Sequence, residues 1–250
     1  MLIIYSNLPM KGILLAGGNG TRMRPLTYIT NKQLLPVYNK PMVMYPLETL
    51  KALGITEILL VSGGEHIGHF SEYLGDGEDF GVSLTYRVQR AAGGIAEALG
   101  LSKAFANGDS VTVVLGDNIF DNSLIPEFNV EEDKAYLFTK KVSNPEKFGV
   151  ISMTAKGREG LPTIIEKPID YVGNQAVVGL YIYPNDVFDI VPTLKPSARG
   201  ELEITDVNNY YVLSNRAEIK ELQGFWSDAG SFDSLLASSN WAKTHSSLDK

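Results

Sequence analysis

The sequence predicts an α/β fold in which a mostly parallel central sheet is flanked by helices on both faces. Two observations predict it. Short apolar segments typical of buried strands alternate with helix-like segments through the first half of the 250-residue chain, and the second half is richer in strand-like segments. No stretch rich in glycine, proline or serine divides the chain, so one large domain is expected.

The expected elements follow from hydrophobic periodicity and from the turn residues between apolar runs. The expected strands lie at 12–16, 57–61, 83–87, 110–115, 135–141, 149–153, 163–166 and 176–183. The expected helices lie at 42–53, 66–74, 95–105, 185–191, 205–214 and 232–243. The domain is expected to span residues 10–243, between an N-terminal extension of residues 1–9 and a C-terminal tail of residues 244–250.

The composition excludes several classes of protein. A net charge of −7 argues against a general binder of nucleic acids or membrane surfaces, which needs a basic face. The chain has no cysteine, which excludes disulfides, thiolate nucleophiles and cysteine-ligated metals. No apolar stretch approaches membrane-spanning length, and residues 1–9 are too short and uncharged for a signal peptide. A cytoplasmic location is therefore expected.

A glycine-rich run follows the first expected strand. Gly17, Gly18 and Gly20 remove the Cβ atoms that would keep a ligand away from the backbone, and Arg22 follows within reach. Backbone N–H groups with a nearby cation are a common way to bind phosphate. Lys32 adds a second cation on the same connection. The alternative is a plain tight turn after a strand.

The glycine run differs from two widespread phosphate-binding motifs. Met23 stands where a dinucleotide-binding fingerprint has its third glycine, and Pro25 obstructs an immediate helix. The run also lacks the Gly-Lys-Ser/Thr ending of a Walker A loop. These departures disfavour an NAD-dependent dehydrogenase.

Two aspartates are candidate ligands of Mg²⁺. Asp117 follows the expected strand 110–115, with Asn118 beside it, at the carboxyl end where ligands of open α/β sheets bind. Asp228 follows another strand-like segment, so both aspartates are expected to project from the same edge of the sheet. The alternative is that each caps a turn through its own backbone.

Charged side chains also gather at two later places. Glu166 and Lys167 stand together at a strand end, and Arg199 opens a charged loop that leads into the helix 205–214. A surface ion pair and ordinary helix-start acids are the alternatives. Because no activated nucleophile is evident, direct displacement on phosphorus, assisted by cations and Mg²⁺, fits better than covalent catalysis.

Taken together and in this order, these segments resemble the sugar nucleotidyltransferase family, and within it the glucose-1-phosphate thymidylyltransferases. The resemblance covers residues 11–241, and its most specific parts are the glycine loop and the run 199–208. It implies a Rossmann-like α/β fold with a strand-rich half that binds the sugar. It also implies a Mg²⁺-dependent reaction in which dTTP and α-D-glucose 1-phosphate give dTDP-glucose and pyrophosphate.

The resemblance further implies a role for each residue at the matched positions. The catalytic cations would be Arg22, Lys32 and Lys167, and the ligands of Mg²⁺ would be Asp117 and Asp228. The nucleotide-binding group, whose last two members read the base, would consist of Leu15, Ala16, Gly17, Gly18, Gly20, Thr21, Gln33, Gln89 and Gly94. The sugar-phosphate-binding group would consist of Asn118, Gly149, Glu166, Val177 and Arg199.

The partners implied are a nucleoside triphosphate, a sugar 1-phosphate and further copies of the chain. A UTP-dependent enzyme making UDP-glucose stays open, because thymine and uracil differ by one methyl group. A non-catalytic sugar-nucleotide-binding protein is the alternative from another class. Longer members of the family continue with further helices that help form a regulatory nucleotide site, so a short form without that control is expected.

Overall fold

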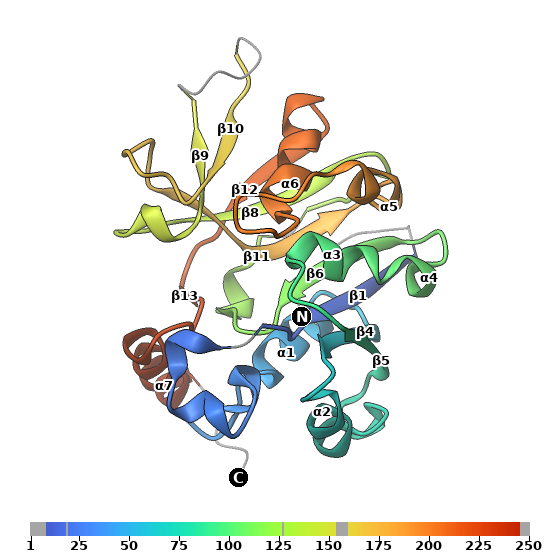
Figure 1. Ribbon diagram of the computed structural model, residues 1–250, viewed down its shortest axis with the longest axis vertical. Helices are drawn as coiled ribbons and strands as arrows, with labels where there is room; N and C mark the ends of the chain where they lie inside the picture. Colours follow the sequence, from blue (N-terminus) through green and yellow to red (C-terminus); the bar gives the residue numbers. More distant parts are fainter. Residues whose placement is uncertain (1–8, 19, 127, 154–159, 246–250) are drawn as a thin grey trace.

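One sheet of nine strands organises the protein (Figure 1). The computed structural model describes residues 9–18, 20–126, 128–153 and 160–245. The strands of the sheet are β1 (Met10–Leu15), β4 (Glu57–Gly63), β5 (Ser83–Gln89), β6 (Ser110–Leu115), β8 (Ala135–Lys141), β9 (Gly149–Ser152), β10 (Thr163–Glu166), β11 (Gln175–Tyr183) and β12 (Ala217–Glu221). Their order is β10-β9-β11-β6-β1-β4-β5, with β8 paired to both β11 and β12.

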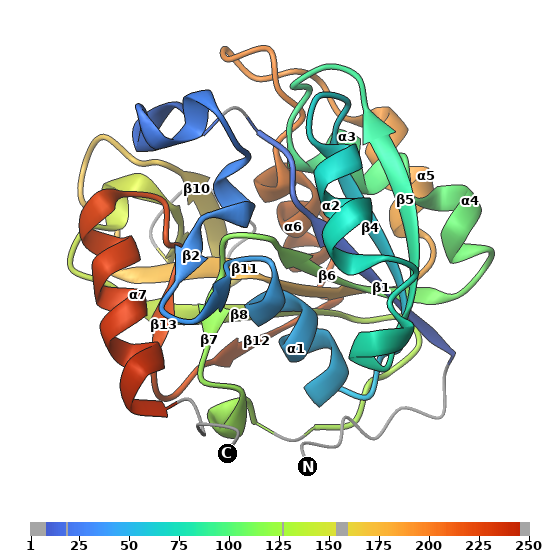
Figure 2. The same cartoon turned by 90° about the horizontal axis from the view of Figure 1, so that it is seen from below.

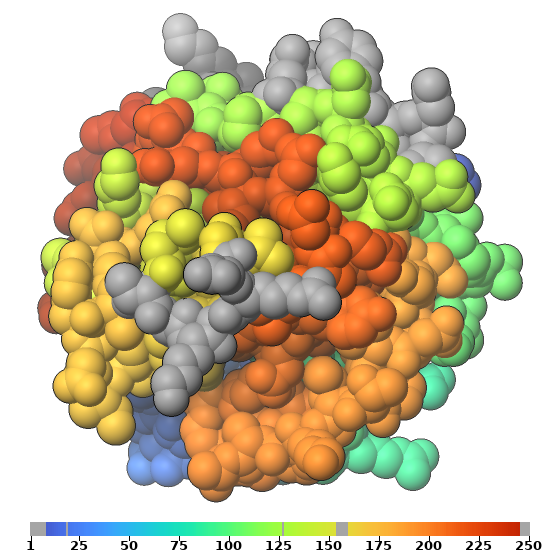
Figure 3. Space-filling view, turned by 90° about the horizontal axis from the view of Figure 1, so that it is seen from above, coloured from blue at the N-terminus to red at the C-terminus, as the bar shows by residue number. Residues whose placement is uncertain are grey.

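The two halves of the sheet differ in strand direction. Strands β6, β1, β4 and β5 are parallel to one another, as predicted for the first half. Strand β11 runs antiparallel to β6, β8 and β9, and β10 runs antiparallel to β9. Seen from above, the molecular surface is formed largely by this second half, coloured yellow to red (Figure 3). The parallel half brings the carboxyl ends of β1, β5 and β6 to one edge, where ligands of such sheets bind.

Helices cover both faces of the sheet. They are α1 (Met44–Ala52), α2 (Ile67–Leu74), α3 (Ile95–Gly100), α4 (Lys103–Ala106), α5 (Val187–Ile190), α6 (Ile204–Leu213) and α7 (Phe232–His245). Successive strand residues point to opposite faces, so Ile13 packs in a core with α3, α5 and α6, whereas Leu14 packs in a core with α1 and α2. Figure 2 looks onto the face that carries α1 and α2.

Two short ladders lie outside the main sheet. Strand β2 (Pro36–Val37) pairs with β3 (Lys40–Pro41), and β7 (Ile119–Phe120) pairs with β13 (Trp226–Ser227). Helix α7 packs beside β2 around a small third core, and the Tyr38 N–H donates to Ser239 Oγ at 3.3 Å (Figure 2). Short 3₁₀ turns connect the larger elements, and they are η1 (Thr21–Met23), η2 (Leu26–Tyr28), η3 (Lys32–Leu34), η4 (Glu78–Phe80), η5 (Asn122–Leu124), η6 (Pro145–Lys147) and η7 (Val191–Thr193).

Most of the predicted elements are present, with ends shifted by no more than two residues. The helix predicted at 95–105 is wrong as a single element, because a tight turn at Leu101 and Ser102 divides it into α3 and α4. The helix predicted at 185–191 is shorter, since Pro192 follows in a 3₁₀ turn. Strand β12 and the two-residue strands were not predicted. The predicted extension and tail fall mainly outside the described residues, and every described helix is too short or too polar to cross a bilayer.

Leu47 tests how far the fold depends on the packing of α1. Its side chain is fully buried between α1 and the sheet. We expect Leu47→Ala to lower the free energy of unfolding by about 2–5 kcal/mol, because it removes apolar contacts and leaves a cavity. Denaturant unfolding followed by circular dichroism measures this change. Leu236→Ala on α7, where the leucine is 62% exposed, is the matched control and should change the value by less than about 0.5 kcal/mol. Equal losses in the two variants would contradict the assignment of the core.

Candidate active site

A cavity of about 640 Å³ opens along the carboxyl ends of β1, β5 and β6. Residues of β10, β11 and the segment before α6 form its opposite wall. Every residue that the sequence analysis assigned to a site lines this cavity, with the exception of Ala16. Ala16 is fully buried, its N–H donates to the Val61 carbonyl at 2.8 Å, and its carbonyl accepts from Ser62 Oγ at 2.9 Å. Ala16 therefore supports the loop from beneath.

The glycine loop leaves β1 along one side of the cavity. Gly18 and Gly20 have positive φ angles of 96° and 57°, which favour glycine. Thr27 Oγ1 donates to the Gly20 carbonyl at 2.8 Å, and a Cβ at Gly20 would lie only 2.9 Å from Thr27 Cγ2. The loop then enters the 3₁₀ turn η1, which carries Thr21 and Arg22 on the cavity wall. In the described part of the chain, Arg22 forms no ion pair.

Gln33 contributes a buried amide beside the same loop. Asn31 caps the turn η3 by accepting the Gln33 N–H at 2.8 Å, which fixes where the glutamine side chain begins. Its Nε2 lies 3.4 Å from the Gly17 carbonyl, but its Oε1 is buried without a partner among the described residues. A buried oxygen without a donor is costly. Gln33 lines the cavity, but this oxygen is itself shielded from solvent.

Gln89 and Gly94 line the cavity at the end of β5. Gln89 is the last residue of β5, and its Nε2 donates to the Gly94 carbonyl at 3.1 Å and to Glu97 Oε2 at 2.6 Å. Gly94 has a φ of 97°, and a Cβ there would lie 2.4 Å from the Leu202 carbonyl oxygen. Only glycine fits between these segments, so the turn between β5 and α3 has a defined shape.

Asp117 stands at the carboxyl end of β6, as predicted. Its Oδ2 forms a short ion pair with Lys32 Nζ, and its Oδ1 accepts from Asn118 Nδ2 at 2.9 Å. Asn118 Oδ1 accepts the Gly179 N–H at 3.0 Å and Trp226 Nε1–H at 2.8 Å. These bonds satisfy the buried Asn118 side chain, and the bond from its Nδ2 orients the Asp117 carboxylate.

Asp228 reaches the cavity by a different route from the one predicted. It does not project from the edge of the main sheet, because the strand before it, β13, pairs with β7 in a separate ladder. That ladder sets Ser227 opposite Ile119, so its continuation brings Asp228 level with Asn118. Asp228 Oδ2 and Arg22 Nη2 lie 3.1 Å and 2.9 Å from the point where a Cβ on Gly230 would stand. The two aspartates therefore share one cavity.

Glu166 is the centre of the charges on the opposite wall. Its Oε1 lies 3.3 Å from Lys167 Nζ and 3.4 Å from Arg199 Nη2, and its Oε2 accepts from Thr205 Oγ1 at 2.6 Å. Lys167 has a backbone φ angle of 44°, which is uncommon for a residue other than glycine. A Cβ at Gly149 would lie 3.1 Å from Thr205 Oγ1, so glycine keeps this part of the wall open. Val177 of β11 lines the wall beside these residues.

The electrostatic environment fixes two protonation states on this wall. Burial would lower the pKa of Arg199, but its hydrogen bond to Glu203 at 2.8 Å and the charges of Glu203, Glu201 and Glu166 raise that pKa, so the guanidinium stays charged. Burial, with a smaller effect of the Glu166 and Asp117 carboxylates, raises the pKa of Tyr181 far above its ordinary value. Tyr181 is therefore a neutral phenol against which the charged groups pack.

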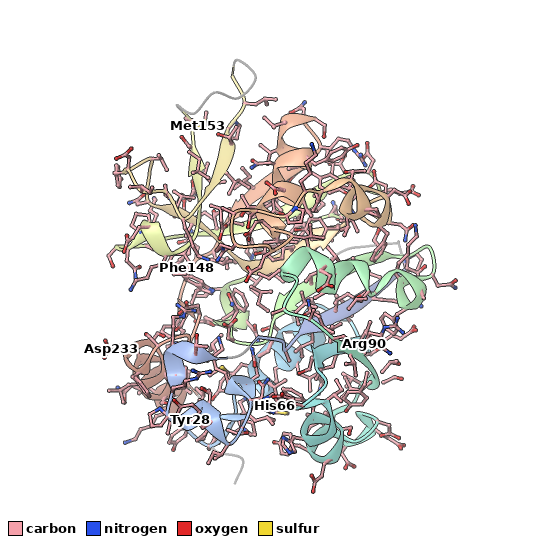
Figure 4. The ribbon with its side chains drawn as sticks, in the orientation of Figure 1. Tyr28, His66, Arg90, Phe148, Met153 and Asp233 are labelled. Atoms are coloured by element: carbon pink, nitrogen blue, oxygen red, sulfur yellow. The ribbon has the colours of Figure 1, made fainter. Side chains whose placement is uncertain are left out.

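The sequence analysis missed several residues that line the cavity. Lys147 is exposed and, among the described residues, has no carboxylate within ion-pair distance. The only sequence signal for its place on the cavity wall was its position next to the Phe148-Gly149-Val150 segment. Phe148 packs edge-on against Trp226 with ring centres 5.3 Å apart. Figure 4 shows Phe148 at the base of the β9–β10 hairpin, away from Met153 near its tip. The residues missed are Met23, Ala92, Ile95, Ala98, Leu115, Lys147, Phe148, Gly179, Tyr181, Glu201, Glu203, Ile204, Thr205, Asn208, Trp226 and Gly230.

The two aspartates fit a magnesium site that is completed by a ligand. Carboxylate oxygens are hard donors of the kind that Mg²⁺ prefers. In the ranges that the structure describes, no three His, Cys, Asp or Glu side chains gather closely enough to hold a metal ion alone. Mg²⁺ is commonly held by one or two carboxylates together with substrate phosphates and water. Asp117 and Asp228, which both line the cavity, are donors of this kind.

Comparison with known proteins agrees with this geometry. The nucleotidyl transferase family matches residues 11–244. The glucose-1-phosphate thymidylyltransferases of Neisseria meningitidis serogroup A and of Mycobacterium tuberculosis are both 42% identical to this chain, over 94% of the chain and 83% of each relative.

Solved structures agree as well. The crystal structure of a putative glucose-1-phosphate thymidylyltransferase from Bacillus anthracis, in complex with a sucrose, has a TM-score of 0.85 and 41% identity, and covers 97% of this chain and 98% of that one. A UDP-glucose pyrophosphorylase complexed with UDP-glucose, at 24% identity and a TM-score of 0.79 over 95% of this chain and 100% of that one, shares the fold. The match along nearly the whole chain, in sequence and in structure, means that this protein belongs to the nucleotidyl transferase family.

Proposed function

We propose that the protein is a glucose-1-phosphate thymidylyltransferase that joins dTTP and α-D-glucose 1-phosphate into dTDP-glucose and pyrophosphate. Relatives with this name are 40–42% identical over 94% of the chain. The observation that carries the proposal is the convergence of a glycine loop, two aspartates and five cations on one cavity. The five cations are Arg22, Lys32, Lys147, Lys167 and Arg199.

The triphosphate binds along the glycine loop. The backbone N–H groups of Gly17, Gly18, Gly20 and Thr21 face phosphate oxygens, with Leu15 and the buried Ala16 supporting the loop. Arg22 and Lys32 balance the charge of the triphosphate. Gln33 contacts the nucleotide from the cavity wall, and Gln89 and Gly94 read the base.

The sugar phosphate binds against the opposite wall. Lys167 and Arg199 hold its phosphate, while Asn118, Gly149, Glu166 and Val177 line the space for the hexose. The phosphate oxygen is already anionic near neutral pH, so no general base is needed. It attacks the α-phosphorus in line with the departing pyrophosphate, forming one P–O bond as the bond to the leaving group breaks. The cations reduce the repulsion between two anionic substrates.

Asp117 and Asp228 would hold Mg²⁺. When bound, Mg²⁺ supplies positive charge that stabilises the phosphate oxygens and orients the leaving group. The Asp117 carboxylate is neutralised by Lys32 in the structure. The Lys32 ion pair occupies only Oδ2 of Asp117, so Oδ1, which accepts one hydrogen bond from Asn118, could serve as the metal ligand while Lys32 stays in place.

Three features accompany the proposal. The unit that carries the activity spans residues 10–243, the protein forms a homo-oligomer, and it acts in the cytoplasm. The first rests on the continuous sheet and the absence of a flexible linker in the described part of the chain, the second rests on the resemblance to the family, and the third rests on the sequence pattern described above. Sedimentation that shows a monomer at micromolar concentration would remove the second without affecting the chemistry.

Pyrophosphate release over a panel of substrates tests the function. The panel combines dTTP, UTP, dCTP and dATP with α-D-glucose 1-phosphate and other hexose 1-phosphates, with and without Mg²⁺. We expect the largest kcat/KM for dTTP with glucose 1-phosphate. A larger value for UTP would favour the uridylyltransferase alternative. Binding of dTDP-glucose without pyrophosphate release from any pair would favour a non-catalytic binder.

Substitution of the two aspartates tests the metal assignment. Asp117→Asn and Asp228→Asn keep the shape but remove the charge, so each should lower kcat by roughly 100-fold or more, since each removes charge stabilisation near the reacting phosphate. The double variant should lose much less than the product of the two single losses, because both residues serve one ion.

The control for these variants is binding of the ion itself. Mn²⁺ affinity in the presence of dTTP, measured by electron paramagnetic resonance, should fall in both single variants, while the thermal unfolding midpoint stays close to that of the unchanged protein. Normal turnover of either variant at low Mg²⁺ would show that the aspartate is only a turn cap.

Lys167→Ala tests the sugar-phosphate side. The variant removes a charge-assisted hydrogen bond worth about 1.5–3 kcal/mol, so kcat/KM for glucose 1-phosphate should fall by roughly 10- to 100-fold. The dissociation constant of dTTP, measured by calorimetry, should change little, and added Mg²⁺ should not restore activity. Lys195→Ala, at an exposed lysine away from the cavity, is the matched control. A loss that extends equally to dTTP binding would contradict the assignment.

A further inference from the structure

The side chain of Gln89 is fixed by two acceptors on the segment that follows it. Its Nε2 donates to the Gly94 carbonyl at 3.1 Å and to Glu97 Oε2 at 2.6 Å. A backbone carbonyl and a carboxylate can only accept hydrogen bonds. The NH₂ group of the amide must therefore face them. A flipped amide would place its oxygen next to the Gly94 carbonyl oxygen and Glu97 Oε2, and the three acceptors would repel one another.

The orientation of the amide leaves Gln89 Oε1 on the side of the glycine loop. This oxygen lies 3.1 Å from the point where a Cβ on Gly17 would stand, so it is next to the glycine loop on the cavity wall. No donor from the described residues reaches it. Because Gly17 has no side chain, the oxygen stays accessible as a hydrogen-bond acceptor.

The Glu97 carboxylate is itself confined. A Cβ on Gly93 would lie 2.3 Å from Glu97 Oε2, so the backbone of Gly93 closes over the carboxylate. The turn is clamped to a distant segment, because the Leu202 N–H donates to the Gly93 carbonyl at 2.8 Å and the Ala96 N–H donates to the Leu202 carbonyl at 3.2 Å. Glu97 does not line the cavity, so it acts on a ligand only through Gln89.

We propose that Glu97 is a positioning residue that makes the site select a pyrimidine with a hydrogen on its ring atom N3. Thymine and uracil carry a hydrogen on N3, which Gln89 Oε1 can accept, and the Gly94 N–H, which has no acceptor in the described part of the chain, can donate to an adjacent carbonyl of the base. Cytosine in the same pose turns the N3 lone pair toward Gln89 Oε1, and two acceptors repel. The inference rests on the proposed function, because it refines how the same site recognises its nucleotide.

Glu97→Gln is the decisive substitution. It preserves size but replaces a carboxylate that can only accept by an amide that can also donate, so only the Gly94 carbonyl still requires the NH₂ group of Gln89 and a turned amide becomes accessible. The ratio of kcat/KM for dTTP to that for dCTP, with glucose 1-phosphate saturating, should fall at least about 10-fold, the effect of one hydrogen bond of about 1.4 kcal/mol. The ratio of the two dissociation constants, measured by calorimetry without sugar phosphate, should fall in parallel. A residue that merely supports the fold would lower both values together and leave the ratio unchanged.

Two further variants keep the test falsifiable. Glu72→Gln, at an exposed carboxylate of α2 that forms no ion pair in the described residues, is the matched control and should leave the ratio as it is. If Glu97→Gln lowers the thermal unfolding midpoint too far for assay, Glu97→Met removes the carboxylate acceptor without adding a donor, which leaves the Gly94 carbonyl as the remaining acceptor for the Gln89 amide, and should also lower the ratio.

The two proposals fail separately. An unchanged dTTP to dCTP ratio in Glu97→Gln, or an unchanged protein that binds both nucleotides equally, would overturn the role of Glu97 and leave the transferase reaction intact. Absence of pyrophosphate release from every substrate pair would overturn the reaction, and the ratio of dissociation constants would still test Glu97.

Discussion

The buried amide of Asn118 joins the three parts of the chain on which the site depends. Its Oδ1 accepts from the backbone of Gly179 in β11 and from the indole of Trp226 in β13, and its Nδ2 donates to Asp117 after β6. Gly179 has to be glycine here, since a Cβ would lie 2.7 Å from Asn118 Cγ. One side chain thereby links the parallel half of the sheet, the antiparallel half and the short ladder, in addition to the ladder hydrogen bonds between β11 and β6.

The cavity holds its charges largely in pairs before any substrate binds. Lys32 neutralises Asp117, and Lys167 and Arg199 both contact Glu166. An unpaired charge in a partly enclosed cavity is costly, and internal pairing limits that cost. Anionic substrates then compete with carboxylates for cations that are already oriented. This competition lowers the affinity for the substrates, but the cations need little rearrangement when the reaction begins.

The sequence predicted those parts of the site that depend on local pattern. The glycine loop after β1 and Asp117 after β6 could be located because apolar runs end in turn residues at these points. The route of Asp228 could not, since β7 and β13 have two residues each and show no period. Lys147 and Glu97 were also missed, because what matters at both is a neighbour in space. Local alternation fixes a strand, whereas a contact across the cavity depends on packing that no short window contains.

The position of α7 has a consequence for synthesis of the protein on the ribosome. This helix follows Asp228 and packs beside β2, near the beginning of the chain, around a core that is separate from the two large ones. The sheet strands β1, β4, β5 and β6 can pair as the nascent chain emerges, but β2 stays uncovered until α7 has been translated. Until then the apolar side chains of this third core are exposed, and transiently exposed apolar surface of this kind promotes aggregation.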